Sequence, residues 1–97
     1  MSVMDGEPFD PPQAKKRIRE IVQSSGLVFT RHADDEMVKD GLAHNDVLNV
    51  LRGGVVEFPE MVKGTWRYRV RTNRIYAVVA FVSERELAVV TAWRIRR

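Results

Sequence analysis

The sequence contains no cysteine, and long apolar runs are absent as well. Without thiols the chain can form neither a disulfide nor a thiolate metal site, and its two histidines are too few for a closed zinc site unless carboxylates complete it. No stretch approaches the roughly 18 consecutive apolar residues of a transmembrane helix. We therefore expect a fold that depends on its hydrophobic core, uses no metal or other cofactor, and does not enter a membrane.

Acidic residues are scarce in the later part of the chain. Residues 61–97 hold nine basic and two acidic residues, a net charge of +7, whereas residues 1–60 hold seven basic and eleven acidic residues, a net charge of −4. Eight of the nine later cations are arginine, which suits planar, bidentate recognition of phosphate or carboxylate. The split favours a polyanionic partner for the later part, and a basic face that only aids solubility is the open alternative.

The beginning of the chain has acids and prolines where a signal peptide would have basic residues and then an apolar run. We therefore expect the protein in the cytoplasm. A length of 97 residues predicts one domain. Residues 1–10 have no hydrophobic period and are expected to form a flexible arm, with residues 11–97 forming the single domain.

The first half of the chain has the period of helices. Asp10 precedes two prolines, which is typical of an N-cap with proline in the first turn. Apolar residues recur at i, i+4, i+7 and i+8 over residues 14–22, and Gly26 is a plausible stop. Residues 27–29 are predicted to be a connector or an edge strand.

Two shorter helices are expected next. Thr30 can cap the second helix, which Gly41 ends, and His44 or Asn45 opens the third helix, which stops at Gly53. The two helices are expected to pack together as a compact helical hairpin.

From residue 55 the period changes to two. Residues 55–58 are a strand candidate, and residues 66–71 alternate aromatic or apolar side chains with arginine, as a half-buried strand does. Residues 75–82 are apolar on both faces and predict a central strand, and residues 87–95 predict a last one. The fold class is therefore α+β, with two or three N-terminal helices packed on an antiparallel sheet of three or four strands.

The alternation places Arg67, Arg69 and Arg71 on one face of the sheet. If the turn consists of residues 73–74, Tyr76 pairs with Arg71 and shares this face. Arginines hold phosphate oxygens and favour the ionised form of a nearby phenol, which can then exchange a proton with a sugar hydroxyl. The alternative is that Tyr76 is a strand aromatic that merely covers the sheet.

Three more arginines, Arg94, Arg96 and Arg97, close the chain. Arg94 and Arg96 point the same way in an extended strand. Whether they share the face of Tyr76 depends on the loop at residues 83–86, because a slip of one residue reverses the faces. A solvated basic tail is the alternative.

The histidines and tryptophans are weaker candidates for chemistry. His44 is expected to cap or pack, and His32, near the start of the second helix, is left open as a general base. The acids at 34–36 are consecutive and point in different directions, which makes a poor paired-carboxylate site. Trp66 and Trp93 could stack on bases, but their alternation with arginine favours a place in the core.

Four short sequence motifs occur in a characteristic order along the chain. The set resembles a bacterial domain family of unknown function, which looks related to the RelE-like toxins, a superfamily that includes BrnT and MqsR. The match covers residues 15–96. The strings that carry it are Thr30-Arg31-His32-Ala33, Asp46-Val47-Leu48-Asn49-Val50-Leu51-Arg52-Gly53-Gly54, Trp66-Arg67-Tyr68 and Val90-Thr91-Ala92-Trp93-Arg94.

The resemblance implies a RelE-like fold and an activity. MqsR-type toxins cleave messenger RNA and are neutralised by an antitoxin, often one with a zinc-binding domain. Their catalytic lysine, glutamine, tyrosine and C-terminal lysine correspond by similarity to Lys63, Arg67, Tyr76 and Arg94, so two of the four differ in type. The family commonly has arginine four residues after its histidine, and here Glu36 takes that place.

The sequence therefore supports one leading hypothesis, a toxin that cleaves messenger RNA without a metal, either free or on the ribosome. In the RelE-like scheme the ribose 2′-hydroxyl attacks the adjacent phosphate. Arg67 and Arg94 would hold the phosphate and Tyr76 would transfer a proton. The residues expected to bind the rest of the strand are Arg69, Arg71, Arg96 and Arg97. The alternative is a non-catalytic basic module that binds nucleic acid or an acidic protein.

Overall fold

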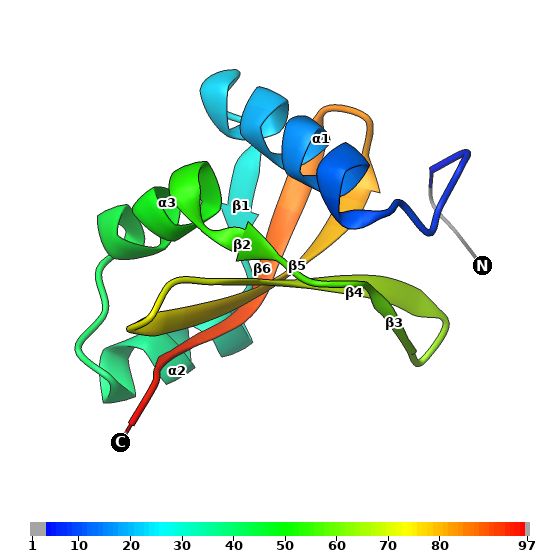
Figure 1. Ribbon diagram of the computed structural model, residues 1–97. Coiled ribbons are helices and arrows are strands. Elements are labelled where there is room, and N and C mark those ends of the chain that lie inside the picture. The colour runs from blue at the N-terminus through cyan, green and yellow to red at the C-terminus, as the bar shows by residue number, and fades with distance from the viewer. Residues whose placement is uncertain (1–3, 97) are drawn as a thin grey trace.

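The computed structural model describes residues 4–96 and combines three helices with six strands (Figure 1). The α+β class is as predicted, whereas the sheet has more strands than the three or four expected. In chain order the elements are α1 (Pro11–Gln23), β1 (Leu27–Phe29), α2 (Arg31–Lys39), α3 (His44–Gly53), β2 (Val55–Val56), β3 (Glu60–Val62), β4 (Thr65–Arg71), β5 (Ile75–Ser83) and β6 (Glu86–Arg94).

Helix α1 begins where the sequence predicts. The Asp10 carboxylate accepts the backbone N–H of Gln13 at 2.9 Å, and the Gln13 side chain accepts the N–H of Asp10 in return. The helix ends at Gln23. Gly26 closes this end as predicted, because its N–H donates to the carbonyl of Ile21 at 2.9 Å. A Cβ at this position would also overlap the carbonyl oxygen of Arg85, where β1 starts beside the β5–β6 turn.

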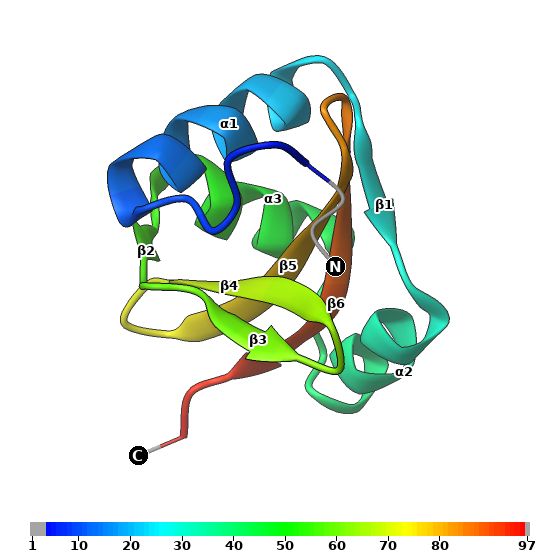
Figure 2. The ribbon, with the colours of Figure 1, turned by 90° about the vertical axis from the view of Figure 1, so that its right-hand side faces the viewer.

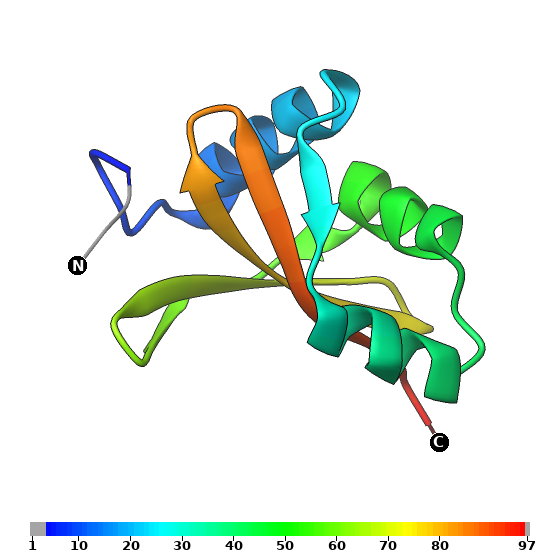
Figure 3. The ribbon, with the colours of Figure 1, turned by 180° about the vertical axis from the view of Figure 1, so that it is seen from behind.

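Helices α2 and α3 do not form the expected hairpin. Thr30 caps α2, as its hydroxyl accepts the N–H of Ala33 at 3.1 Å and donates to the carbonyl of Val90 at 3.2 Å. This second bond ties the start of α2 to β6, against which α2 packs (Figure 3). Helix α3 instead packs beside α1 and against β4 and β5 (Figure 2).

The sheet has the order β1-β6-β5-β4-β2, with β3 pairing separately with β4. All the pairs are antiparallel except β1–β6, which is parallel. Strand β5 is central, in agreement with its apolar residues on both faces. The strand at 27–29 is an edge strand, one of the two roles expected for it. Strand β3 was not expected, since three residues are too few to show an alternation.

One hydrophobic core lies between the sheet and the helices, and it includes Ala33 and Met37 of α2. Tyr68 is fully buried in it, with Phe81 and Phe9 in edge or stacked contact at centroid distances of 5.3 and 6.4 Å. Phe9 and Met4 come from the segment expected to be a loose arm, yet they are only 3% and 6% exposed. The described residues of that segment, 4–10, therefore pack on the core, and Glu7–Pro8 is a cis peptide bond.

Among residues 4–96, no helix combines the length and the apolar character needed to cross a bilayer.

Candidate functional site on the arginine face of the sheet

The β4–β5 hairpin brings the predicted residues together. Arg71 pairs with Tyr76 and Arg69 with Val78, which is the register that a two-residue turn predicts. Tyr68 and Val70 point into the core, so the alternate side chains lie on the other side of the sheet. We call this side, with Arg67, Arg69, Arg71 and Tyr76, the arginine face.

A carboxylate lies at the centre of this face. Oε2 of Glu57 accepts a hydrogen bond from Nε of Arg71 at 2.7 Å and from the hydroxyl of Tyr76 at 3.1 Å. The backbone holds Glu57 in place, because its N–H donates to the carbonyl of Arg69 at 2.9 Å. Its other oxygen, Oε1, has no described partner. Glu57 therefore joins a cation and a phenol and keeps one oxygen available to accept a proton.

A second carboxylate reduces the charge of the face. Arg69 donates to Oε1 of Glu60 at 3.0 Å, and Glu60 pairs with Arg67 across β3 and β4. The three arginines thus lie among two acids, Glu57 and Glu60. The face is less basic than the charge split of the sequence predicts, because both acids come from the part of the chain that is acidic overall.

Arg67 has a donor without a partner. Its side chain is half-buried, and its Nε is fully buried with no hydrogen bond. Within residues 4–96 no other buried side-chain nitrogen or oxygen is left in this state. A buried donor without a partner costs free energy, and because this Nε is closed to solvent a ligand can reach Arg67 only through the rest of its guanidinium.

Trp93 belongs to the arginine face and not to the core. It pairs with Tyr76 across β5 and β6, and the two rings are stacked with centroids 5.2 Å apart and planes 18° from parallel. The expectation of a core role is correct for Trp66, which packs against the core cluster. The stacked indole limits the movement of the Tyr76 ring.

Arg94 lies on the opposite side of the sheet. It pairs with Ile75, and a bulge is the reason: Thr91 pairs with Val78 and Val89 with Val79, which leaves Val90 as an extra residue. This one-residue shift reverses the faces of the end of β6. Arg94 therefore does not share the face of Tyr76, which was left open by the sequence.

Arg94 and Arg96 instead hold the end of α2. The Arg94 guanidinium donates to the carbonyls of Asp40 at 2.8 Å and Gly41 at 3.2 Å, and its N–H donates to Oδ2 of Asp40 at 2.8 Å. Arg96 donates to Oδ1 of Asp40 at 2.7 Å. Both arginines have structural partners, and Arg97 lies outside the described residues.

Two further candidates lie away from the site. Lys63 is exposed in the β3–β4 turn, and the seven residues of β4 separate it from the Arg71–Tyr76 pair by roughly 20 Å at about 3.3 Å per residue. His32 is exposed on α2. His44 packs as expected, since it stacks on Phe29 with centroids 3.8 Å apart and bonds Asp34 at 2.7 Å.

Glu57 is the functional candidate that the sequence did not single out, and Trp93 is one that the sequence placed in the core. The sequence signal for Glu57 is its spacing of two residues from Val55, because residues two apart along a strand lie on the same face. Val55 pairs with Arg71 of β4, so Glu57 lies on the side of the arginines. Trp93 could not be assigned without the bulge. Within the described part of the chain, no cluster of histidine, aspartate and glutamate could hold a metal ion.

The fold and the site define an α+β domain with a polar sheet face that combines arginines, a carboxylate and a stacked phenol. The chain belongs to the family DUF4258, a domain of unknown function, whose model matches residues 29–94. This confirms the resemblance to a family of unknown function, and the matched segment contains the whole arginine face. Neither the curated proteins nor the solved structures contain a match to the chain.

Proposed function

We propose that the protein is an endoribonuclease that cleaves RNA without a metal ion. The observation that carries this proposal is the Glu57 carboxylate, hydrogen-bonded to both Arg71 and Tyr76 on the arginine face. A surface that only binds phosphates gains nothing from a carboxylate among its arginines, because the carboxylate repels the ligand. A surface that cleaves RNA can use a carboxylate as the general base for the ribose 2′-hydroxyl.

The groups present balance the reaction. Oε1 of Glu57 takes the proton of the ribose 2′-hydroxyl, the 2′-oxygen bonds to the adjacent phosphorus, and the bond from phosphorus to the 5′-oxygen breaks. The hydroxyl of Tyr76 gives its proton to the leaving 5′-oxygen. The products are a 2′,3′-cyclic phosphate and a 5′-hydroxyl end.

The arginines stabilise the negative charge that develops on the non-bridging phosphate oxygens. Arg67 is only half-buried and takes part in none of the ion pairs within residues 4–96, and guanidinium groups bind the non-bridging phosphate oxygens with planar pairs of hydrogen bonds. After cleavage, Glu57 carries the proton on Oε1 and Tyr76 is a phenolate. Because the Tyr76 hydroxyl is bonded to Oε2, exchange with water restores both groups.

The biological setting follows from the resemblance to RelE-like toxins. In this setting the protein is a toxin with a RelE-like fold that acts in the cytoplasm on messenger RNA, free or on the ribosome. Its other partner is a cognate antitoxin, zinc-binding or not. The arginine face supports the chemistry of this proposal, and the resemblance supplies the rest.

The first test is purified protein with a long single-stranded RNA in excess EDTA, beside Glu57→Gln and Tyr76→Phe. Removing a general acid or base costs about 10²–10⁴-fold in rate, so both variants should lose nearly all cleavage. Glu84→Gln, at an exposed acid of the β5–β6 turn, is the matched control and should cleave normally. The products should carry 2′,3′-cyclic phosphate ends.

Two results would contradict the proposal. Cleavage at the wild-type rate by both Glu57→Gln and Tyr76→Phe would remove the site from the mechanism. Retention of RNA without cleavage, both alone and with translating ribosomes, would instead favour the non-catalytic module.

A further inference from the structure

Helix α1 carries a row of cations that have no ion-pair partner among the described residues. The row consists of Lys15, Lys16 and Arg19, and Arg52 adds a fourth cation at the end of α3. None of the ion pairs within residues 4–96 includes any of them. On the arginine face, by contrast, Arg69 and Arg71 are each paired with a glutamate of the same chain.

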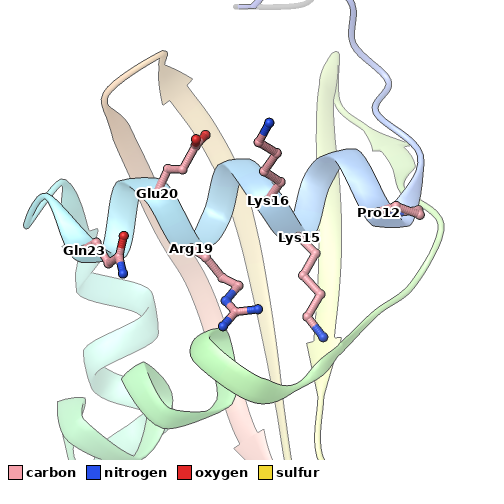
Figure 4. A pocket seen from close by; sticks show the side chains of 6 residues that line it. All are labelled: Pro12, Lys15, Lys16, Arg19, Glu20 and Gln23. Atoms are coloured by element: carbon pink, nitrogen blue, oxygen red, sulfur yellow. The ribbon is translucent and has the colours of Figure 1, made fainter.

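The side chains of this row border a shallow hollow along α1. Figure 4 shows Lys15 and Arg19 extending from the helix toward α3, while Lys16 and Glu20 extend from its other side. The hollow has a volume of about 510 Å³, and Glu20 is its only acidic residue. Its three cations outnumber this one acid, so its electrostatic potential is positive, and none of the ion pairs within residues 4–96 includes a residue of its lining.

An apolar groove adjoins the cations. It has a volume of about 310 Å³ and is lined by Pro11, Pro12, Lys15, Val55 and Val56. Val55 is 52% exposed although its side chain is entirely apolar. Pro12 and Lys15 line both hollows, so the apolar groove and the basic row form one continuous surface, which we call the α1–β2 surface.

We propose that the α1–β2 surface binds an acidic amphipathic segment of a partner protein. Apolar side chains of the segment would fill the groove beside Val55, and its carboxylates would pair with Lys15, Lys16 and Arg19. Charge complementarity favours an anion, and the groove favours a polypeptide over a nucleic acid, because it offers aliphatic side chains and no aromatic ring on which a base could stack.

This inference does not depend on the proposed nuclease. Lys15 and Arg19 belong to α1, which packs on the core side of the sheet, and neither takes part in the chemistry proposed for Glu57 and Tyr76. The groove lies at the edge of the sheet, where Val55 pairs with Arg71. A segment bound beside Val55 would therefore reach the margin of the arginine face.

The test uses the full chain and a labelled helical peptide of about 18 residues, five turns, with leucine on one face and glutamate on the other. The double variant Lys15→Glu/Arg19→Glu should weaken peptide binding by more than about tenfold, since like charges would then face each other. Val55→Ser should weaken it as well. Arg31→Glu makes the same kind of charge change at the first turn of α2 and should bind normally.

Amide chemical shifts of the labelled protein give an independent measurement, and circular dichroism checks that each variant is folded. Shifts confined to residues 11–19 and 52–56 would support the proposal. Absence of binding would overturn it, as would equal weakening by Arg31→Glu, which would indicate a response to net charge alone.

Two further results would point to a different ligand. If a peptide with serine in place of leucine binds equally well, the groove has no role. If single-stranded RNA binds wild type but not Lys15→Glu/Arg19→Glu, the surface belongs to a nucleic acid. Cleavage of RNA by the same variants, measured in parallel, reports on the nuclease separately.

Discussion

Tyr68 is a polar side chain at the centre of an apolar core, and its hydroxyl has two partners. It accepts the backbone N–H of Phe9 at 3.0 Å and donates to Oε2 of Glu7 at 2.9 Å. Burial raises the pKa of Tyr68 well above its usual value, and the Glu7 carboxylate raises it further, against the opposing effect of the Phe9 amide. The N-terminal segment is thus attached to the core through a neutral phenol.

This environment makes the free energy of unfolding depend on alkaline pH. The unfolded chain releases the Tyr68 proton near pH 10, whereas the folded protein retains it, so the unfolded state binds fewer protons above about pH 10. The free energy of unfolding should therefore fall as pH rises beyond this value, by up to about 1.4 kcal/mol per pH unit from this one group. Urea unfolding between pH 8 and 11 measures the slope.

Tyr68→Phe provides the comparison. The variant should be less stable at pH 8, by about 1–3 kcal/mol, because the Phe9 amide loses a buried partner. Its stability should then decline less steeply in alkali than that of the wild type. Equal slopes for the two proteins would show that another group titrates.

At the scale of single residues, sequence patterning predicted part of the site. Arg67, Arg69 and Arg71 share a face because strand residues alternate, and Tyr76 joins them because the turn is short. Glu57 could not be placed, since its contacts depend on how β2 approaches β4. An alternating pattern shows which way a side chain points along its own strand, but not what comes from the next one.

At the scale of elements, the contact between α2 and β6 gives Arg94 a structural role, whereas the resemblance to RelE-like toxins implied a catalytic one. Arg94 donates to the carbonyls at the end of α2, where a cation is also favourable against the helix dipole. Arg94→Ala and Asp40→Ala should each lower the free energy of unfolding by about 1–2 kcal/mol and leave RNA cleavage unchanged. Thermal unfolding and the EDTA assay measure the two effects.

Arg85→Ala, at an exposed position in the β5–β6 turn, is the control for the loss of an arginine. If Arg94→Ala abolishes cleavage while the protein remains as stable as the control, the guanidinium acts on RNA after all. This would require the end of β6 to leave its contact with Asp40.

Some helices and strands could be predicted from the sequence, and some of their contacts could not. The caps and apolar period of α1 are local, and so they were predictable. The partner of α2 was not: Ala33 and Met37 mark an apolar face, but nothing in their spacing says that β6 rather than α3 covers it. Likewise, the bulge at Val90 is a local change of register that period-two alternation does not reveal.

At the scale of the whole molecule, the charge split overstates the cations available to RNA. Of the nine basic residues in 61–97, Arg94 and Arg96 are bound to Asp40, and the arginine face itself carries three arginines among two acids. Two or three phosphate contacts predict a slope of log K against log salt of about −1.4 to −2.1, compared with about −5 if the net charge of +7 on residues 61–97 were matched by seven phosphate contacts.

The slope is measured with labelled single-stranded RNA and the inactive variant Tyr76→Phe, by fluorescence anisotropy at increasing salt. Glu60→Gln should bind RNA more tightly, because it releases Arg69. A slope steeper than about −4 would mean that RNA wraps over cations outside the arginine face.

The parallel pairing of β1 with β6 also sets the order in which the chain can fold. Leu27 pairs with Leu87, and Thr30 bonds a carbonyl 60 residues later in the sequence. At about 5–20 residues per second, a ribosome needs roughly 3–12 s to make the intervening chain. During that interval the contacts of α1 and of the Thr30 hydroxyl with β6 cannot form, because β6 has not been synthesised. Completion of the sheet is therefore delayed until the final strand has been synthesised, and the early segments depend on staying soluble until then.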